Sequence, residues 1–273
     1  MKQEILSAMV IRNLQTVEEL EKVRQLEVMI WGLEDSVPVN QSVAAVKNGG
    51  FILGAFLKEE LIGFQYNFPG FNGKKIYLCS HSLGIHPDYR KFGIGEKLKI
   101  AQRETAIGIG YDLITWTYDP LETVNGNLNL HKLKAVCNTY MENAYGEMPD
   151  NMNAGIPTDR FLVEWWIKEP IEKTEPDKGH SLVIKTSTNG SFLTPHEMDL
   201  MQVNDSLFVP VPGNFQEIKK HNFPLALSWR ERTRKVFSYY LSQGWTVTDL
   251  VKDDEQSNQY LYLLEKGAHR HGN

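Results

Sequence analysis

The stretch LGIHPDYRKFGIG, residues 83–95, decides the fold of this chain. It joins a predicted strand, residues 76–85, to a predicted helix from Gly93 to about residue 108, and it places Arg90-x-x-Gly93-x-Gly95 at the junction. Two glycines at a helix start let a bulky anion come close to the backbone. The N–H groups of the first turn, at Lys91 through Glu96, face that anion, and the helix dipole favours it. With the positive charges of Arg90 and Lys91, the loop predicts a pyrophosphate cradle.

The spacing within the loop separates this cradle from two others. An ordinary glycine-containing loop remains the alternative, because Arg-x-x-Gly-x-Gly alone occurs by chance. The strand before it and the helix after it favour phosphate binding. No Gly-Lys-Ser/Thr ends the loop, which excludes the nucleotide P-loop, and the absence of Gly-x-Gly-x-x-Gly excludes the dinucleotide fingerprint.

Composition limits the classes of function. The chain has 273 residues with 29 Lys+Arg and 34 Asp+Glu, a net charge of −5. This acidic balance argues against a nucleic-acid wrapper or a basic membrane-surface protein. No apolar run reaches the roughly 18 residues of a membrane span, and the start is too charged for a signal peptide. Only Cys79 and Cys137 are present, without metal-ligand spacing, so we expect a cytoplasmic protein with free thiols and no metal.

The first half of the chain alternates strands and helices in a defined order. Thr16 and Glu19 have the spacing of a capping box and open the first helix. The predicted order is strand, helix, helix, three strands, helix, strand. The strands are expected at 9–13, 51–58, 61–68, 76–85 and 111–118, and the helices at about 16–31, 40–46 and 93–108.

The second half contains the clearest linker. We expect a helix from about Leu128 to Asn143 and an apolar strand, Phe161–Ile167. Glu169–His180, with two prolines, a glycine and many charges, then predicts a domain boundary. The predicted domains are residues 1–168 and 169–273. The second should hold strands near 182–185 and 207–211, helices at about 215–220 and 224–241, and a closing hairpin of 245–251 and 260–265.

At this point the chain resembles the GNAT N-acetyltransferase superfamily. The loop Arg90–Gly95 and the strand before it are similar to motif A of that superfamily, and the element order from Met9 to Ile167 is similar too. More specifically, the chain resembles a subgroup of predicted acetyltransferases of unassigned substrate. The matching stretches are Leu98–Arg103, Trp116–Leu121, Asn129-x-x-Lys-Leu133, Tyr140 with Tyr145-Gly146, Gly155–Arg160, the Pro-Gly-Asn-Phe-Gln segment and Leu227–Arg230. The resemblance implies an α/β fold with a mixed, splayed central sheet, here followed by a C-terminal α+β region.

The resemblance also implies an acyl-coenzyme A site. The pyrophosphate would sit on the loop, and the pantetheine would run beside the preceding strand. The neighbouring strand, residues 113–118, would splay away and leave a gap for the thioester. Asn129 is expected to reach the cofactor, with a solvated helix face as the alternative. The cofactor-binding residues implied are Leu83, Gly84, Ile85, Arg90, Lys91, Phe92, Gly93, Ile94, Gly95, Glu96 and Asn129.

The implied function is transfer of an acetyl group from acetyl-coenzyme A to the amine of a small molecule by direct attack. The partners expected are that amine and no nucleic acid or membrane, with a homodimer left open. A non-catalytic acyl-coenzyme A-binding module, serving as a sensor or subunit, is the alternative. A phosphate-binding hydrolase is disfavoured, because no Gly-x-Ser-x-Gly motif is present.

Catalytic residues are less clearly marked. In a typical member, a tyrosine ahead of a Gly-Phe pair protonates the thiolate. Tyr140 is the nearest match, one residue out of register, and a half-buried helix tyrosine is its alternative. Glu164 is the candidate general base because it interrupts an apolar strand, and Asp119 and Glu34 are further candidates.

The C-terminal part has a second similarity. Arg234–Trp245, followed by a hairpin, also resembles the end of a GNAT fold. It is either a degenerate second GNAT-like half without motif A, which we favour, or a segment that completes the first sheet after a long insertion. In both cases it could form one wall of the acceptor pocket.

Overall fold

The computed structural model describes the chain except residues 1, 149, 151, 169–180, 203 and 269–273, and it contains two compact units. The first unit consists of residues 1–116 and 166–169, and the second of residues 117–165 and 170–273. The units divide within two strands. The predicted boundary after residue 168 does not coincide with this division, and the whole predicted linker, residues 169–180, lies outside the described residues.

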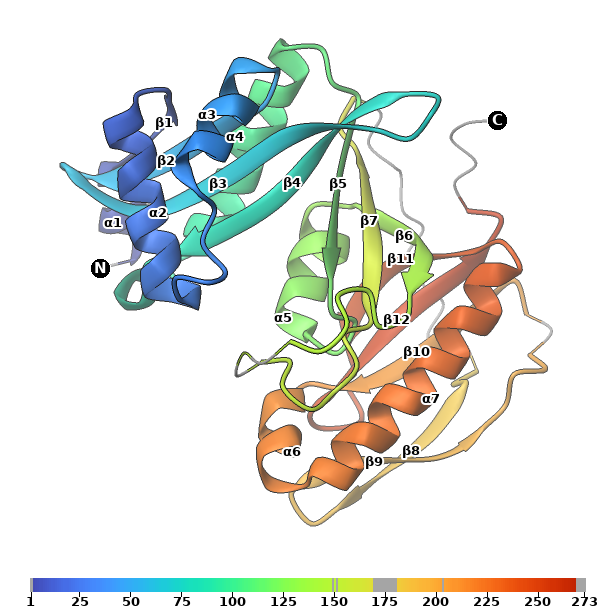
Figure 1. The fold of residues 1–273 in the computed structure, drawn as a ribbon. Helices are drawn as coiled ribbons and strands as arrows, with labels where there is room; N and C mark the ends of the chain where they lie inside the picture. Colours follow the sequence, from blue (N-terminus) through green and yellow to red (C-terminus); the bar gives the residue numbers. More distant parts are fainter. Residues whose placement is uncertain (1, 149, 151, 169–180, 203, 269–273) are drawn as a thin grey trace. The chain divides into compact units, whose positions relative to one another are not determined.

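The first unit has the element order expected from the sequence. After a helix that was not predicted, α1 (Lys2–Ala8), the order of strand, helix, helix, three strands, helix and strand is confirmed (Figure 1). The elements are β1 (Met9–Leu14), α2 (Val17–Trp31), α3 (Val39–Lys47), β2 (Phe51–Leu57), β3 (Glu60–Phe71), β4 (Ile76–Ile85), α4 (Ile94–Gly108) and the start of β5 (Leu113–Tyr118). The strands lie in the order β1-β2-β3-β4-β5, antiparallel except for the parallel pair β4–β5, so the sheet is mixed.

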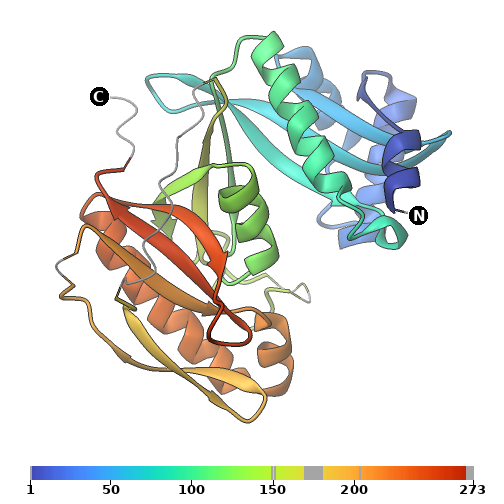
Figure 2. The same ribbon diagram turned by 180° about the vertical axis from the view of Figure 1, so that it is seen from behind.

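Helices cover both faces of this sheet (Figures 1 and 2). Successive residues of β3 point to opposite faces. Phe64 and Tyr66 pack in one hydrophobic core with Leu20, Val23 and Leu26 of α2. Gln65, between them, instead bonds to a serine that also contacts α4. Helices α2 and α3 therefore cover one face, and α4 covers the other.

Pairing between β4 and β5 is short. The register joins Leu78 to Ile114 and Cys79 to Thr115, whereas β4 continues to Ile85. Directly after these pairs, the register of β4 against β3 shifts, so that His81 is an extra residue, a β-bulge. A bulge bends its strand, and the sheet splays at this point as predicted.

The second unit contains the end of β5 and, apart from residues 166–169, the chain that follows it. Its elements are α5 (Thr123–Gly126), the π-helix η2 (Asn127–Lys132), β6 (Val136–Met141), β7 (Arg160–Trp166), the hairpin β8 (Ile184–Asn189) and β9 (Phe192–Met198), β10 (Ser206–Pro212), α6 (Phe215–His221), α7 (Phe223–Ser242), β11 (Trp245–Lys252) and β12 (Gln259–Lys266). The main strands lie in the order β5-β7-β6-β11-β12-β10.

The helix predicted from Leu128 to Asn143 is wrong. The helical segment ends near Leu133, and Lys134 has a positive φ of 59°. A non-glycine residue in this left-handed region is uncommon and breaks a helix. Residues 136–141 then form β6, in which Val136 pairs with Glu164 of β7. Tyr140 therefore lies on a strand and not on a helix.

The strand order of the second unit contains the same arrangement twice. One arm is β5-β7-β6 and the other is β10-β12-β11. In each arm a strand leads through helices into an antiparallel pair, and the arms meet where Cys137 of β6 pairs with Val247 of β11. The repeat is one of strand order, and the assignment of the C-terminal part to a second GNAT-like half stays a prediction.

One aromatic core spans both arms. The ring of Phe161 on β7 lies 4.7 Å from that of Phe237 on α7 and 5.6 Å from that of Tyr262 on β12, centroid to centroid. All three side chains are buried. Residues 117–165 and the C-terminal segment therefore fold around a common core.

Candidate functional site: the glycine loop and its surroundings

The predicted loop lies between β4 and α4 in the first unit. After β4, a short 3-10 turn, η1 (Pro87–Tyr89), leads into the loop, and the Arg90 Nε–H donates to the carbonyl oxygen of Ile85 at 3.4 Å. Lys91 and Gly93 both have positive φ, 69° and 90°, and α4 begins at Ile94. The left-handed residues turn the chain sharply, so that the first turn of α4 starts directly beside the end of β4.

Gly93 and Gly95 are glycines for different reasons. Gly93 is the N-cap of α4 in the left-handed region, where a side chain is strained. A Cβ on Gly95 would meet nothing closer than Leu83 Cδ2, at 3.5 Å, which is ordinary contact. The fold therefore does not require glycine at position 95. A ligand that comes close to the backbone at this position would require a glycine there, because a Cβ would occupy the space of the ligand.

Gly84 has a packing role. A Cβ there would lie 2.4 Å from Cε1 of Phe64 and 2.9 Å from Cδ1 of Ile30. Its neighbours Leu83 and Ile85 are half-buried. The structure thus brings the implied residues of β4 and the loop together in one unit.

Charge at the loop suits an anion. Arg90 and Lys91 are exposed, and the first N–H groups of α4 have no carbonyl partner within the helix. The macrodipole adds partial positive charge at the same end. Backbone amides, a helix end and two cations can hold a phosphate or pyrophosphate group.

The remaining predicted site residues lie in the second unit. Asn129 is buried on η2, and its backbone carbonyl oxygen accepts a hydrogen bond from the Ala135 N–H at 3.1 Å. Glu164 is half-buried on β7. Tyr140 lies on β6. Glu34 of the first unit is exposed in the turn after α2.

Tyr140 belongs to a polar clamp. Its hydroxyl donates to Asp159 Oδ2 at 2.6 Å, and burial together with the Asp159 charge raises the pKa of Tyr140. Asp159 also accepts from Arg234, at 2.8 Å from Nε and 2.6 Å from Nη2, and from the Asn143 amide at 3.0 Å. Burial would raise the pKa of Asp159, but these donors lower it overall. The clamp joins β6, the start of β7 and α7.

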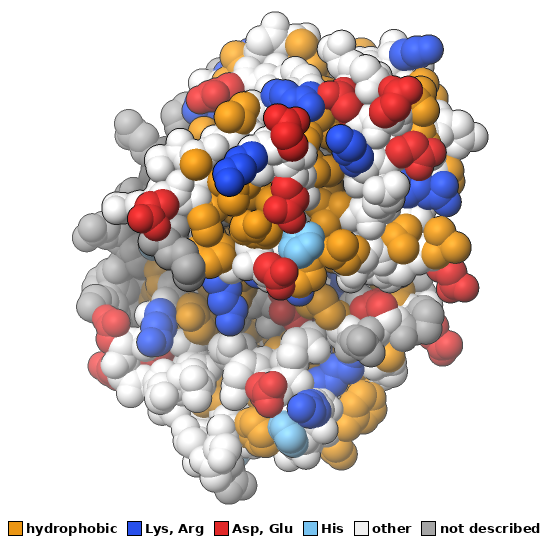
Figure 3. All heavy atoms as spheres, turned by 90° about the vertical axis from the view of Figure 1, so that its left-hand side faces the viewer, with side chains coloured by type: hydrophobic (Ala, Val, Ile, Leu, Met, Phe, Trp, Pro, Cys, Tyr) orange, Lys and Arg blue, Asp and Glu red, His pale blue; other side chains and the backbone are white. Residues whose placement is uncertain are grey.

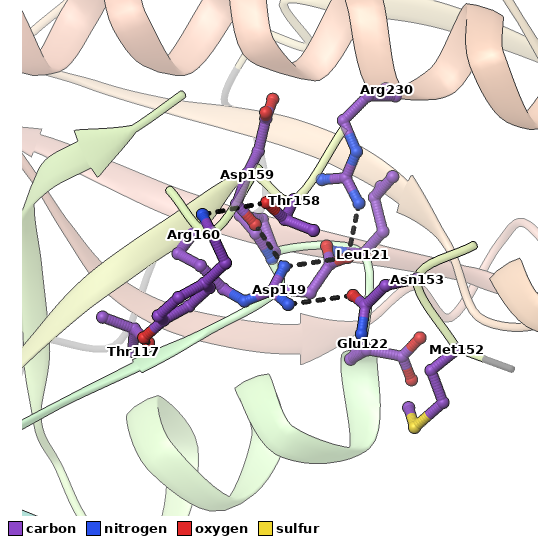
Figure 4. A network of polar contacts seen from close by, with 12 residues as sticks. Thr117, Asp119, Leu121, Glu122, Met152, Asn153, Thr158, Asp159, Arg160 and Arg230 are labelled. Carbon is purple, nitrogen blue, oxygen red and sulfur yellow. Dashed lines mark hydrogen bonds and ion pairs between the residues drawn. The ribbon is translucent and has the colours of Figure 1, made fainter. Parts of the chain in front are cut away.

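A second polar network surrounds Asp119 (Figure 4). Asp119 pairs with Arg230 of α7, which is 1% exposed, and lies 3.8 Å from Nη1 of Arg160. Arg160 also donates to Asn153 Oδ1 at 2.9 Å. As the partner of a buried arginine, Asp119 has a structural role that explains its presence at the end of β5.

Sequence reasoning missed one buried cation in the first unit. Lys99 of α4 is 4% exposed, and its Nζ donates to Ser80 Oγ at 2.8 Å and lies 3.5 Å from the centroid of Trp116. Burial lowers the pKa of Lys99 to about 7. A lysine on a helix is ordinarily solvated, so the sequence carried no signal for the burial of Lys99.

The surface charges and the metal-ligating side chains do not indicate a further site. Figure 3 shows acidic and basic side chains interspersed with hydrophobic ones on the face that it displays. Among the described residues, no group of three or more His, Cys, Asp or Glu side chains is placed to hold a metal ion. No helix in the same part of the chain has the length and apolar character needed to cross a bilayer.

Comparisons with known proteins found similar folds. No protein-family model and no curated protein matches the chain. Among solved structures, it is similar to the NatC complex bound to Gag peptide and CoA, with 14% identity over 60% of this chain and 99% of that chain, at a TM-score of 0.47. It is similar to a GNAT-family acetyltransferase from Streptococcus pneumoniae, with 16% identity over 57% and 98%, at 0.46. A third match is Arabidopsis thaliana Naa50 in complex with the bisubstrate analogue CoA-Ac-MVNAL, with 14% identity over 57% and 97%, at 0.45.

Proposed function

We propose that this protein is an acetyl-coenzyme A-dependent N-acetyltransferase that moves the acetyl group to the amine of a small molecule. One observation carries the proposal. Gly93 has a left-handed backbone and Gly95 is a glycine that packing does not require, and together they leave the first-turn N–H groups of α4 accessible beside the end of β4. This geometry suits a pyrophosphate group.

The residues of the first unit have distinct tasks in this proposal. The amides of the α4 first turn, with Arg90 and Lys91, hold the pyrophosphate. The edge of β4 at Leu83–Ile85 holds the pantetheine by backbone hydrogen bonds. Acetyl-coenzyme A supplies the activated acyl group, and the protein orients it and excludes water. Backbone N–H groups at the bulge around His81 are the candidates that polarise the thioester carbonyl.

A non-catalytic acyl-coenzyme A-binding module is the second candidate. It is favoured by the position of Tyr140, whose hydroxyl is held by Asp159 in a clamp that explains it structurally. Tyr140 as acid and Glu164 as base stay predictions. The N–H groups that hold the coenzyme serve both candidates equally.

Calorimetric titration of acetyl-coenzyme A into the purified chain tests the binding step. Gly95→Ala should fold normally, because its Cβ meets only ordinary contacts, and should lose at least tenfold in affinity by crowding the anion. Gly108→Ala, at the open end of the same helix, is the matched control and should bind like the wild type. Equal affinity in all three proteins would refute the loop assignment.

A thiol-release assay separates the two candidates. Incubation of the chain with acetyl-coenzyme A and a panel of small amines should release free thiol with at least one amine. Tight coenzyme binding without thiol release for any amine would favour the binding module.

A further inference from the structure

Lys99 lies where the hydrogen bonding between β4 and β5 ends. Its two contacts, Ser80 and Trp116, directly follow the last paired residues, Cys79 on β4 and Thr115 on β5. The Nζ atom is therefore held between the two strands at the point where they begin to diverge, and all these residues belong to the first unit.

This lysine is buried without a carboxylate. Among the described residues it forms no ion pair. The groups that face it are Cys79 and Ser80 from β4 and Trp116 from β5, and Gln65 from β3 shares the Ser80 hydroxyl with it. Of these only Cys79 is titratable, and burial raises the pKa of its thiol to about 11. A buried ammonium that lacks a counter-charge is costly to the fold.

Two further polar side-chain atoms on this side of the sheet have no hydrogen-bond partner among the described residues. Gln65 Oε1 and Gln102 Oε1 are buried without a hydrogen bond, although the amide of Gln65 donates to the same Ser80 Oγ as Lys99 does, at 3.0 Å. Native cores rarely leave such atoms unsatisfied without a reason. The cluster is thus better suited to receive a charged or polar group than to stabilise the empty fold.

We propose that Lys99 stabilises the coenzyme thiolate as it leaves and then supplies its proton, an inference that rests on the proposed acetyltransfer. The attacking amine forms a bond to the acetyl carbon, and the bond from that carbon to sulfur breaks with its electron pair going to sulfur. The Lys99 ammonium faces the resulting negative charge. It gives one proton to the sulfur. The amine loses its proton to solvent, and the neutral lysine takes a proton back from solvent, which restores the ammonium.

The chemistry of the cluster fits this role. Because no carboxylate neutralises the ammonium, its positive charge is available to stabilise the negative charge that forms on sulfur during the reaction. Ser80 and the Trp116 ring fix its direction, and the cation–π contact holds the charge without neutralising it. A thiol with the usual cysteine-like pKa of about 8.5 is basic enough, as thiolate, to take a proton from this lysine.

The test compares coenzyme A, which has a free thiol, with desulfo-coenzyme A. We measure affinity by calorimetry and the thiolate fraction of the bound coenzyme by its ultraviolet absorbance, with the desulfo complex as the blank. Below about pH 7, where Lys99 carries its charge, the ammonium should raise the thiolate fraction of wild-type-bound coenzyme A above that of the free coenzyme at the same pH. In Lys99→Met this excess should disappear, while the affinity for desulfo-coenzyme A stays within about twofold.

Gln102→Met is the matched control, because it removes a buried polar side chain from the same face of α4 without removing the charge. It should keep the thiolate excess. The inference is overturned if Lys99→Met retains the excess, or if Gln102→Met loses it equally. Failure of the wild type to bind either coenzyme is a different result, which overturns the proposed function itself.

Discussion

At the scale of single residues, buried charged side chains make the stability of this protein depend on pH, and Lys99 has the clearest effect. Burial lowers its pKa to about 7, whereas the unfolded chain keeps the ordinary value of 10.5. Between these values the unfolded state binds more protons, so the free energy of unfolding rises with pH, by at most about 1.4 kcal/mol per unit. Lys99→Met should lack this rise. Urea unfolding between pH 7 and pH 10.5 measures the free energy of unfolding of both proteins. The same dependence on pH in both would contradict the lowered pKa of Lys99.

The clamp at Asp159 makes a second residue-scale prediction. Tyr140→Phe removes one hydrogen bond and should cost about 1 kcal/mol. Asp159→Ala leaves the Arg234 guanidinium, the Tyr140 hydroxyl and the Asn143 amide without their acceptor, and should cost several times more. Chemical denaturation compares the two. A Tyr140→Phe protein as unstable as Asp159→Ala would show that the tyrosine has a larger packing role than its bond.

At the scale of elements, the capping box of α2 is the prediction from sequence that the structure confirms most directly. The Glu19 N–H donates to Thr16 Oγ1 at 3.2 Å, and the Thr16 N–H donates to Glu19 Oε2 at 3.1 Å. Burial alone would raise the pKa of Glu19, but the amides of Gln15 and Thr16 and the charge of Arg12 lower it to about 2.

Thr16→Ala should therefore cost about 1 kcal/mol of stability, because it leaves a first-turn amide unsatisfied. The contribution of Glu19 is fully present above its unfolded pKa near 4.5 and is lost as pH falls toward 2. Thermal unfolding at neutral and acidic pH measures both effects. If Glu19→Gln loses as much stability between neutral and acidic pH as the wild type does, the Glu19 carboxylate does not contribute to the pH dependence of stability.

Elements were predictable where local signals and tertiary demands agreed. The glycine loop, the strands around it and the capping box all follow from short-range patterns, because each is stabilised by residues close in sequence. The segment 128–143 was not predictable in this way. Its apolar residues fit a helix up to Leu133, but Val136 and Cys137 gain partners in β7 and β11 that are distant along the chain.

Lys99 shows the same limit at the candidate site. A lysine on a helix is ordinarily solvated, and only the three-dimensional meeting of Ser80 and Trp116 shows that this one is buried. The clamp at Asp159 was equally hidden, since Arg234 lies 75 residues further along the chain. Sequence spacing identified the anion-binding loop but not the groups that surround it.

At the scale of the whole molecule, the repeated strand arrangement raises the question of how many coenzymes one chain binds. The arms β5-β7-β6 and β10-β12-β11 have the same order, yet in the described part of the chain only the first is preceded by a strand, a glycine loop and a helix of the α4 type. In the sequence, Arg-x-x-Gly-x-Gly occurs once, at residues 90–95. The second arm therefore lacks the sequence motif that we assign to the pyrophosphate.

Titration of acetyl-coenzyme A into the full chain should therefore give one site per polypeptide, and Gly95→Ala should weaken that single site without exposing another. Because the second arm shares an aromatic core with β7, it contributes to folding whether or not it contacts a substrate. Calorimetric stoichiometry decides the matter, with protein concentration fixed by amino-acid analysis. A value near two would mean that the C-terminal arm binds the coenzyme by residues unrelated to the glycine loop, and the degenerate-half interpretation would fail.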